Sequence, residues 1–372
     1  MGQYFHGAFP DLDCRHVAGL RGYPLQRKFF WIFIPLSLLI SSCAGQHQKS
    51  AFFADSGAKP LVWPAPPEKP RIKLLKVFTG GEEFTLPKGT FRTLFEKITG
   101  ETSKPVGFMA PAGVVGDGDR FIYIADPSAR LVHKIDTIEN EVSYLSHAGS
   151  EPLASPVGVA LDSSGNLYVT DSVKAKVFKY NAHGEYTGTV GGAAVEIQRP
   201  AGIDVGRNDY KYVADVLANR VFIFDSHDSF VRQVPDQNDK ELSKPVNVAV
   251  APDGSFYVTD AFSFSVKGFD PSGKQISSFG AAGDGPGTFA RPKGLALDSE
   301  SHIYIVDANF DNFQIFNTTG QLLLYVGSTG KKPGQFFMPN GIHIDHNDRI
   351  YISDSFNQRV QIFQYLKENG SK

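Results

Sequence analysis

The stretch Lys244–Gly273, KPVNVAVAPDGSFYVTDAFSFSVKGFDPSG, decides the fold because it is one copy of a unit that occurs six times. Each copy opens with Pro, one variable residue and then Gly or Asn. It continues through an apolar run, a polar turn, a second apolar run that closes in Asp, a loop and a third apolar run. The opening prolines are Pro111, Pro156, Pro200, Pro245, Pro292 and Pro339, and the closing aspartates are Asp126, Asp171, Asp215, Asp260, Asp307 and Asp354. Both sets step by 45, 44, 45, 47 and 47 residues, a period that indicates a β-propeller.

The predicted fold is an all-β, six-bladed β-propeller over residues 72–366, followed by a polar tail at 367–372. Each copy supplies three strands, and a fourth apolar run follows in most copies, as at 322–326. The sixth copy stops after its third run, 360–365. We therefore expect an N-terminal strand at about 72–79 to complete the last blade and close the ring, which removes exposed sheet edges.

The repeated spacing of Pro, Gly and Asp in the six copies has a structural explanation. Proline fixes φ, and glycine allows six backbones to crowd near the axis. The repeated Asp is expected to accept backbone N–H bonds in the loop that follows it. Six carboxylates at equivalent positions could also form a site, but their presence in every copy favours the structural role.

The unit resembles the NHL-repeat family of six-bladed propellers over about residues 72–365. The matching features are the P-x-G opening, the segment Asp253–Asp260, and the run NRVFIF at Asn219–Phe224. The later copies also share a glycine-rich lead-in that begins at Gly280 and at Gly327. The resemblance implies the fold, whereas the function stays open, because this family includes scaffolds, ligand binders and enzymes.

One enzymatic branch to which the sequence is similar is the peptide-amidating lyases, in which His residues just after the opening Pro hold zinc. The matching positions here carry no His; they are Ala112, Val157, Ala201, Val246, Lys293 and Asn340. Calcium-dependent lactonase-like propellers use Glu, Asn and Asp residues around the axis, and this sequence has no matching set of Glu. The resemblance therefore supports neither chemistry, and no cofactor is predicted.

The amino-terminal region has the pattern of an export signal. Two basic residues precede the twelve-residue apolar run Phe29–Ile40, which is shorter than a comfortable membrane span. The string LISSC at Leu39–Cys43 resembles a bacterial lipobox, so residues 1–42 are predicted as a signal segment and Cys43 as the acylated residue. An uncleaved anchor helix is the alternative.

The residues around this signal predict where the protein is held. Ala44, in place of Asp, favours the outer membrane of a bacterial cell envelope, by resemblance to Gram-negative lipoproteins. Residues 1–24 make a poor basic leader, and a non-ATG start near Leu25 would give a shorter one. Residues 43–71, rich in Pro, are predicted as a semi-rigid tether that holds the domain off the membrane.

An insertion at about 81–108 separates the closing strand from the first copy of the unit. It is predicted to contain a short helix with one apolar face, made of Phe91, Leu94, Phe95 and Ile98. The helix would either plug a gap between blades or cover one mouth of the central channel.

Two polar residues are predicted to face the central channel. The first strands alternate, and the side that faces the axis carries Val115, Ala160, Asp204, Ala249, Ala296 and His343. Asp204 in the third copy and His343 in the sixth lie opposite each other in a six-fold ring. They are either two unrelated, solvated residues or a pair that binds a cation or small ligand. Two protein ligands are few for a metal site, so the metal content stays unknown.

The loops after each repeated Asp are the second candidate site, because they lie on the same face as the opening prolines. The candidate binding rim is Arg130, Lys176, Arg220, Phe262, Phe264, Phe310, Asp311, Phe356 and Arg359. Aromatic residues with interspersed Arg are typical of protein interfaces. The alternative is that these Phe side chains pack between blades.

We therefore expect an exported, lipid-anchored propeller that binds a protein partner of the cell envelope, or a ligand, through its loop face. The alternative is a hydrolase or lyase with a metal or ligand site in the central channel. Export and the net charge of −2 disfavour nucleic acid as a partner.

Overall fold

The fold is that of a computed structural model, which describes residues 51–53, 60–86, 105–192, 194–236 and 242–367. The chain divides into two compact units, Met1–His47 and Gln48–Lys372, and every described residue belongs to the second. None of the described helices is long and apolar enough to cross a membrane. The predicted signal segment, Cys43 and the apolar helix face in the insertion lie outside the described residues.

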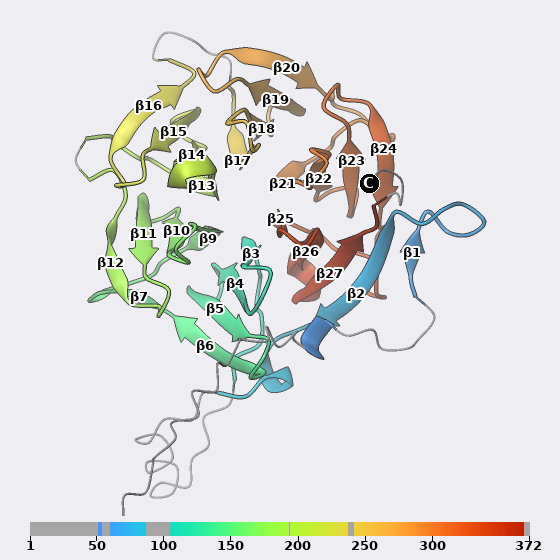
Figure 1. Cartoon of the computed structure of the whole chain (residues 1–372), viewed down its shortest axis with the longest axis horizontal. Helices are drawn as coiled ribbons and strands as arrows, with labels where there is room; N and C mark the ends of the chain where they lie inside the picture. The colour runs from blue at the N-terminus through green and yellow to red at the C-terminus, as the bar shows by residue number, and fades with distance from the viewer. Residues whose placement is uncertain (1–50, 54–59, 87–104, 193, 237–241, 368–372) are drawn as a thin grey trace, which may run out of the picture. The chain divides into compact units, whose positions relative to one another are not determined.

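Six antiparallel sheets stand around a central axis as the blades of a propeller, with the first strand of each blade innermost (Figure 1). Blade 1 comprises β3 (Val114–Gly116), β4 (Phe121–Asp126), β5 (Leu131–Asp136) and β6 (Glu141–Leu145). Blade 2 comprises β9 (Pro156–Leu161), β10 (Leu167–Asp171), β11 (Lys176–Tyr180) and β12 (Tyr186–Thr189). Blade 3 comprises β13 (Pro200–Val205), β14 (Lys211–Asp215), β15 (Arg220–Phe224) and β16 (Phe230–Val234). Blade 4 comprises β17 (Pro245–Val250), β18 (Phe256–Asp260), β19 (Ser265–Phe269) and β20 (Gln275–Phe279). Blade 5 comprises β21 (Pro292–Leu297), β22 (Ile303–Asp307), β23 (Asn312–Phe316) and β24 (Leu322–Val326). Blade 6 comprises β25 (Ile342–Ile344), β26 (Arg349–Asp354), β27 (Arg359–Tyr365), β2 (Ile72–Phe78) and β1 (Val62–Trp63). The short elements are the hairpin β7 (His147–Ala148) with β8 (Glu151–Pro152), and the 3-10 turns η1 (Ala51–Phe53), η2 (Gly81–Glu83), η3 (Arg207–Asp209) and η4 (Ser355–Asn357).

The core lies in the six seams between neighbouring blades, and each seam holds one apolar cluster. Each second strand is buried on both faces, as in β18, where all five residues are buried. Such strands read as nearly continuous apolar runs because both of their faces pack. Aromatic rings fill the seams: Phe313 of blade 5 and Phe363 of blade 6 meet edge to face with centroids 5.6 Å apart. Phe residues supply much of this packing among the described residues.

The N-terminal strand closes the ring, which confirms the prediction. β2 pairs antiparallel with β27 over its whole length, from Ile72 opposite Tyr365 to Phe78 opposite Val360. Ile72 lies in the cluster between blades 5 and 6, and Phe78 lies in the cluster between blades 6 and 1. The first and last strands of the propeller are thus held in one sheet.

Much of the predicted 43–71 tether packs against the propeller, so the predicted boundary at residue 72 is too late. β1 adds a fifth strand to blade 6, outside β2 (Figure 1). Phe52 is buried beside Phe78, with ring centroids 5.5 Å apart. Arg349 of blade 6 stacks over Phe53 at 3.9 Å from the ring centre. The apolar side chains in this Pro-rich stretch are docking residues, which composition alone does not reveal.

The repeated aspartates are buried and bind backbone N–H groups, as predicted. Asp126 accepts hydrogen bonds from Ser128 N and Ala129 N in the loop that follows, at 3.1 and 3.0 Å. It also accepts one from Met109 N at 2.6 Å, in the segment before the opening Pro. The same two-sided pattern recurs at Asp171, Asp215 and Asp307. Each Asp therefore ties the loop after the second strand to the connection that leads into the first.

The antiparallel order of the strands determines which connections lie at the same end of the propeller. Strand direction alternates within an antiparallel blade, so the second-to-third loops and the fourth-to-first connections lie at one end. We call this end the loop face. The first-to-second and third-to-fourth turns lie at the opposite end, which we call the turn face.

Candidate functional site

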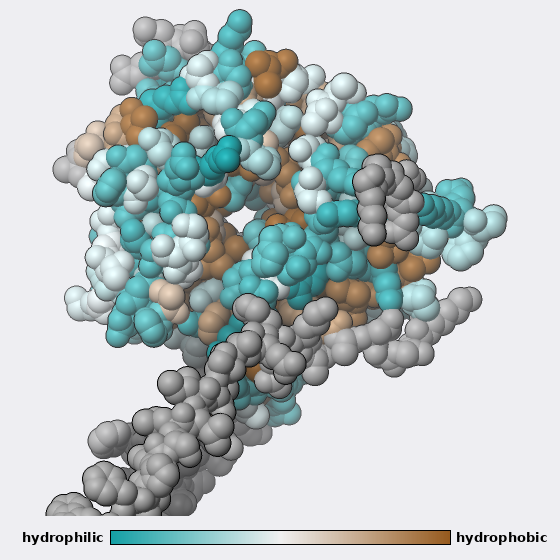
Figure 2. Space-filling view, in the orientation of Figure 1, coloured by the Kyte–Doolittle hydropathy of each residue, from teal (hydrophilic) through white to brown (hydrophobic). Residues whose placement is uncertain are grey.

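A cavity of about 730 Å³ occupies the centre of the ring and is lined by the first strands. Figure 2 shows the opening at the axis, with hydrophobic residues on its wall and hydrophilic residues over much of the surrounding face. The wall consists mainly of Gly, Ala, Val and Ile from the P-x-G segments. A cavity of this size and composition can hold a small molecule.

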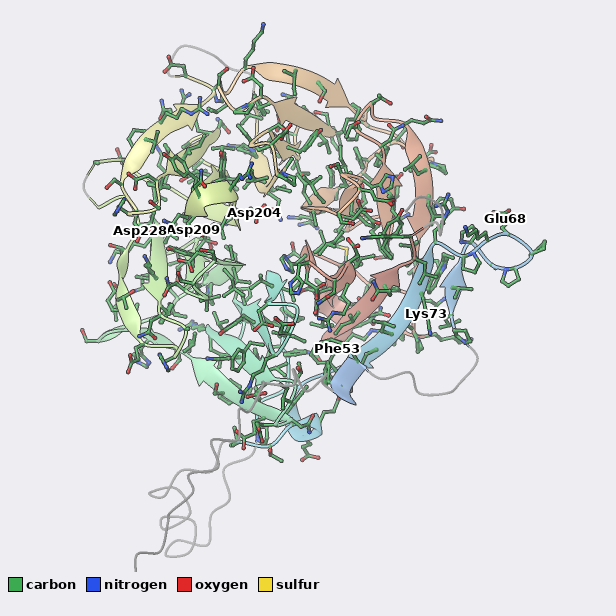
Figure 3. All side chains as sticks on the ribbon, in the orientation of Figure 1. Phe53, Glu68, Lys73, Asp204, Asp209 and Asp228 are labelled. Carbon is green, nitrogen blue, oxygen red and sulfur yellow. The ribbon has the colours of Figure 1, made fainter. Side chains whose placement is uncertain are left out.

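Asp204 lines this cavity at the inner edge of blade 3 (Figure 3). Its Oδ1 accepts a hydrogen bond from Val205 N at 2.9 Å, and its Oδ2 accepts one from Val250 N of blade 4 at 2.8 Å. Burial raises the pKa of Asp204 to about 6, although these two hydrogen bonds act in the opposite direction. The carboxylate therefore joins two blades and also faces the channel.

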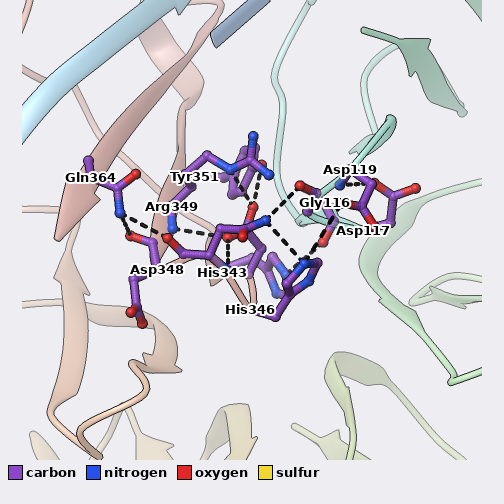
Figure 4. A network of polar contacts seen from close by, with 12 residues as sticks. Gly116, Asp117, Asp119, His343, His346, Asp348, Arg349, Tyr351 and Gln364 are labelled. Atoms are coloured by element: carbon purple, nitrogen blue, oxygen red, sulfur yellow. Dashed lines mark hydrogen bonds and ion pairs between the residues drawn. The ribbon is translucent and has the colours of Figure 1, made fainter. Parts of the chain in front are cut away.

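His343 lines the same cavity from β25 of blade 6. Its Nε2 donates to the carbonyl oxygen of Gly116 in blade 1, with the two atoms 3.1 Å apart (Figure 4). Burial lowers the pKa of His343, so the ring favours its neutral form. Beneath it, Arg349 Nε and the Tyr351 hydroxyl both donate to Asp345, at 2.8 and 2.7 Å.

Asp204 and His343 are both in the channel, as predicted, but each binds the backbone of the blade beside it. Within the described ranges no cluster of three or more His, Cys, Asp or Glu side chains has the geometry to hold a metal ion. Pairing of these two residues around a cation therefore stays a prediction.

The two ends of the channel differ in charge. The carboxylates that line it are Asp117, Asp162, Asp204 and Asp345, all on the turn-face side. The cations that line it, Arg199 and Lys293, are on the loop-face side, next to the opening prolines of blades 3 and 5. The field along the axis is therefore positive toward the loop face.

The loop face itself carries exposed apolar side chains at a repeated position. The residue two places after the repeated Asp is Val173 in blade 2, Leu217 in blade 3, Phe262 in blade 4 and Phe356 in blade 6. Their exposed fractions are 70, 50, 69 and 64%. Large apolar residues at four equivalent, solvent-facing positions do not serve packing within the blades.

Of the two ends of the propeller, only the loop face carries exposed large apolar residues among those the structure describes. The structure describes thirteen that are exposed, and seven lie on the loop face: Val106, Met109, Val173, Leu217, Phe262, Phe337 and Phe356. The other six lie on the outer strands or beside β1: Leu61, Tyr186, Val231, Ile276, Leu323 and Tyr325. None of the thirteen lies in the turns of the opposite face.

Four of the predicted rim residues are exposed on the loop face: Arg130, Lys176, Phe262 and Phe356. Lys176 forms an ion pair with Glu151 at 2.8 Å. Phe356 meets Phe337 edge to face, with ring centroids 5.5 Å apart. These aromatic side chains do not pack between blades.

Two predicted rim residues are buried, so their assignment to the rim surface is wrong. Arg359 binds Asp354 at 2.7 Å and donates to the carbonyl oxygens of Lys331, Lys332 and Gln335. Asp311 accepts a hydrogen bond from Met338 N at 2.7 Å. Both residues hold loops in place.

The remaining three predicted rim residues are partly buried, so only part of each side chain could contact a partner. Arg220 donates to the carbonyl oxygens of Pro235 and Asp236. Phe264 packs against the apolar cluster between blades 4 and 5, and Phe310 is half-buried. For Phe264 the alternative interpretation, packing between blades, is therefore correct.

Sequence reasoning missed five exposed loop-face residues: Val106, Met109, Val173, Leu217 and Phe337. Aligning the copies on the repeated Asp would have shown Val173 and Leu217 at the position of Phe262. Aligning on the opening Pro would have shown Met109 and Phe337 two places before it. The search for aromatic and charged residues passed over the aliphatic members of these positions.

Two family models match parts of the chain. One, described as a six-bladed beta-propeller, matches residues 297–369, and the other, described as the NHL repeat, matches residues 153–180. No curated protein matches the sequence.

Several solved structures share the fold. An auxiliary nutrient binding protein from Bacteroides thetaiotaomicron is 14% identical over 78% of this chain and 77% of its own, with a TM-score of 0.56. A gluconolactonase from Xanthomonas campestris is 17% identical over 70% of this chain and 87% of its own, with a TM-score of 0.56. Virginiamycin B lyase from Staphylococcus aureus is 13% identical over 69% of this chain and 96% of its own, with a TM-score of 0.52.

At these identities the likeness establishes the fold and leaves the function open, because one architecture supports binding proteins and enzymes alike. The family matches, the six repeated units and the closed ring of six blades agree. The chain therefore has a six-bladed β-propeller fold, and its second blade carries the NHL-repeat match.

Proposed function

We propose that this protein is an exported, lipid-anchored propeller that binds a partner protein through its loop face. The observation that carries the proposal is the one-sided exposure of large apolar residues, including Phe262 and Phe356. Exposed apolar residues gathered on one face of a soluble domain mark interaction surfaces, and aromatic residues contribute most to binding energy.

Charge on the loop face narrows the kind of partner. The exposed cations there are Arg130, Lys176, Arg199, Arg291, Lys331 and Lys332. They outnumber the exposed carboxylates described in the connections between blades, which are Glu82, Glu83, Glu196, Asp236 and Asp284. The turn face carries many acidic turn residues, among them Asp119, Asp162 and Asp253. A partner with an apolar centre and an acidic border would complement the loop face and would be repelled by the turn face.

We expect Phe262→Ser combined with Phe356→Ser to weaken partner binding by about 30-fold or more, because two interface anchors are removed. The melting temperature should stay nearly unchanged, since both side chains are mostly exposed. The matched control is Ile276→Ser on β20, which is equally apolar and 57% exposed but lies on the outer strand of blade 4. Measurement is by surface plasmon resonance against the captured partner. Equal loss in both variants would exclude the loop face as the binding surface.

The lipid anchor is the second part of the proposal and rests on the lipobox-like string that ends at Cys43. Cys43→Ser is expected to move the protein from the membrane fraction to the soluble fraction of the cell envelope, because the acylated thiol is lost. Fractionation and immunoblotting measure this. Ser42→Thr, which keeps the thiol, serves as the control. A Cys43→Ser variant that stays with the membrane would favour an uncleaved anchor helix.

A second candidate is a hydrolase or lyase with its site in the channel. It is favoured by Asp204, whose pKa burial raises to about 6, a value suited to a general base near neutral pH. The gluconolactonase and the virginiamycin B lyase supply the analogy. Asp204→Asn separates the two candidates: an enzyme would lose turnover, whereas a partner-binding propeller would keep its affinity.

A further inference from the structure

One inner strand of the ring opens differently from the other five. The residue after the opening Pro is Ala112, Val157, Ala201, Val246 or Asn340 in five blades, and it is Lys293 in blade 5. Lys293 lines the central cavity and is half-buried. No described carboxylate lies within ion-pair distance of its Nζ. An ammonium group in this position is expected to attract a counter-charge from solution.

The neighbouring blade carries the second exception, at the position where the other five blades have Gly. A Cβ on Gly294 or Gly341 would lie 2.6 or 2.1 Å from a carbonyl oxygen of the next blade, which explains the Gly at this position. Blade 4 has Asn247 there instead, and it lies beside Gly202, whose missing Cβ leaves room for the amide. Asn247 Oδ1 accepts from Val248 N at 2.8 Å, which leaves Nδ2 as a donor.

Two more donors line the same end of the cavity, Arg199 from blade 3 and Asn340 from blade 6. No described residue forms a hydrogen bond with the side-chain amide of Asn340. The acidic residues that line the cavity are all toward the turn face, as in Asp162 and Asp204. Cationic and amide donors without a carboxylate among them form an environment that favours oxyanions over metal cations.

We propose that the loop-face end of the channel is a binding site for a small oxyanion, a carboxylate or phosphate group of a ligand, held by Lys293, Asn247, Asn340 and Arg199. Lys293 provides the charge-assisted hydrogen bond at the centre of the site. The side-chain amides of Asn247 and Asn340, in the two flanking blades, donate to the same oxyanion. Arg199 lies at the loop-face opening of the channel. The cavity of about 730 Å³ leaves room for the rest of a small molecule toward the axis.

The proposed site also predicts a change in the pKa of Lys293. Burial, together with the charge of Arg291, lowers the pKa of Lys293. A bound oxyanion would reverse this effect, because an opposite charge favours the protonated amine. Binding is therefore expected to raise the pKa of Lys293.

The test is isothermal titration calorimetry of the full-length chain in detergent with two probes, inorganic phosphate and citrate. We expect saturable binding of at least one probe, weakening as sodium chloride is added. Lys293→Met should reduce the affinity about tenfold or more. Lys274→Met removes an exposed lysine of the turn face and should bind as the wild type does.

Asn247→Gly is the second variant, and it restores the glycine that the other five blades carry. It should still unfold in one cooperative thermal transition and bind the probe several-fold more weakly, so loss of binding cannot be attributed to misfolding. Binding of phosphate alone or of citrate alone identifies the preferred oxyanion. No saturable binding of either probe to the wild type, or equal binding by Lys293→Met, overturns the proposal. The partner surface is tested separately, because Phe262→Ser with Phe356→Ser leaves all four donors in place.

Discussion

Deleting β2, residues 72–78, is expected to abolish cooperative unfolding of the whole propeller, because this strand pairs with β27 and so holds the start of the ring to its end in one sheet. Its loss would expose the full edge of β27 and open two seams, those that contain Ile72 and Phe78. Each apolar cluster between blades needs both of its blades in place. Loss of the closing strand is therefore expected to destabilise the neighbouring blades in turn around the ring.

A point variant makes the same test with a milder change. Ile72→Asp places a carboxylate in the cluster between blades 5 and 6, where the side chain of Ile72 is fully buried. An unpaired buried charge of this kind lowers the free energy of unfolding by about 4 kcal/mol or more. Lys69→Asp, in the exposed loop between β1 and β2, introduces the same residue without burial and is the control.

Urea denaturation followed by circular dichroism measures both variants. The expected result is a single transition shifted far toward low urea for Ile72→Asp and an unshifted transition for Lys69→Asp. An unaltered midpoint for Ile72→Asp, or normal melting of the β2 deletion, would show that the ring is stable without its closure.

Removing a repeated aspartate is the second change with a large expected effect, and Asp260 is the best position for it. Its carboxylate accepts from Ser243 N at 2.9 Å, Lys244 N at 2.7 Å and Lys267 Nζ at 2.9 Å. Asp260→Ala leaves these three donors without their acceptor in a buried site. We expect the free energy of unfolding to fall by about 3–5 kcal/mol.

The loss should depend on pH in a defined direction. Burial acts to raise the pKa of Asp260, but the hydrogen bonds from Lys244, Lys267 and Ser243 outweigh it, and the net pKa is lowered. A carboxylate whose folded pKa lies below the unfolded value stabilises the fold fully above the unfolded value of about 4. This contribution is lost as pH falls through the folded pKa. The difference between wild type and Asp260→Ala should therefore be largest at pH 7 and shrink below pH 4.

Urea denaturation at pH 7 and at pH 3 measures this difference. Asp284→Ala removes an exposed carboxylate from the connection between blades 4 and 5 and should change stability little at either pH. A difference for Asp260→Ala that grows on acidification would refute the hydrogen-bonding role assigned to the carboxylate.

The overall fold could be predicted from the sequence because each repeat must fill the same place in the ring. The spacing of Pro111, Pro156 and their equivalents set the number of blades, and the missing fourth strand of the last copy pointed to the strand at 72–78. The repeated Asp was interpretable for the same reason, since a residue required in every blade serves the blade. Features that occur once gave no such signal, as with Phe52, whose docking between blades 6 and 1 depends on tertiary contacts alone.

The candidate site could be predicted only in part, because exposure is a property of the folded surface. Phe262 lies in a second-to-third loop and Arg359 is the first residue of the strand that follows the equivalent loop, yet Phe262 is exposed and Arg359 is buried against Asp354. The channel positions of Asp204 and His343 followed from strand alternation, whereas their backbone partners in the next blade did not. Those partners depend on how closely neighbouring first strands approach, which the sequence does not specify.

The most direct test of the loop-face proposal is site-specific photo-crosslinking in intact cells. A benzophenone side chain would replace Phe262 on the loop face, Ile276 on the outer strand of blade 4, and Ser164 in a turn of the opposite face. We expect one protein to be crosslinked in high yield at position 262, while positions 276 and 164 give none of it. Crosslinking of that protein at position 164 or 276 with none at 262 would contradict the account and move the binding surface to another face.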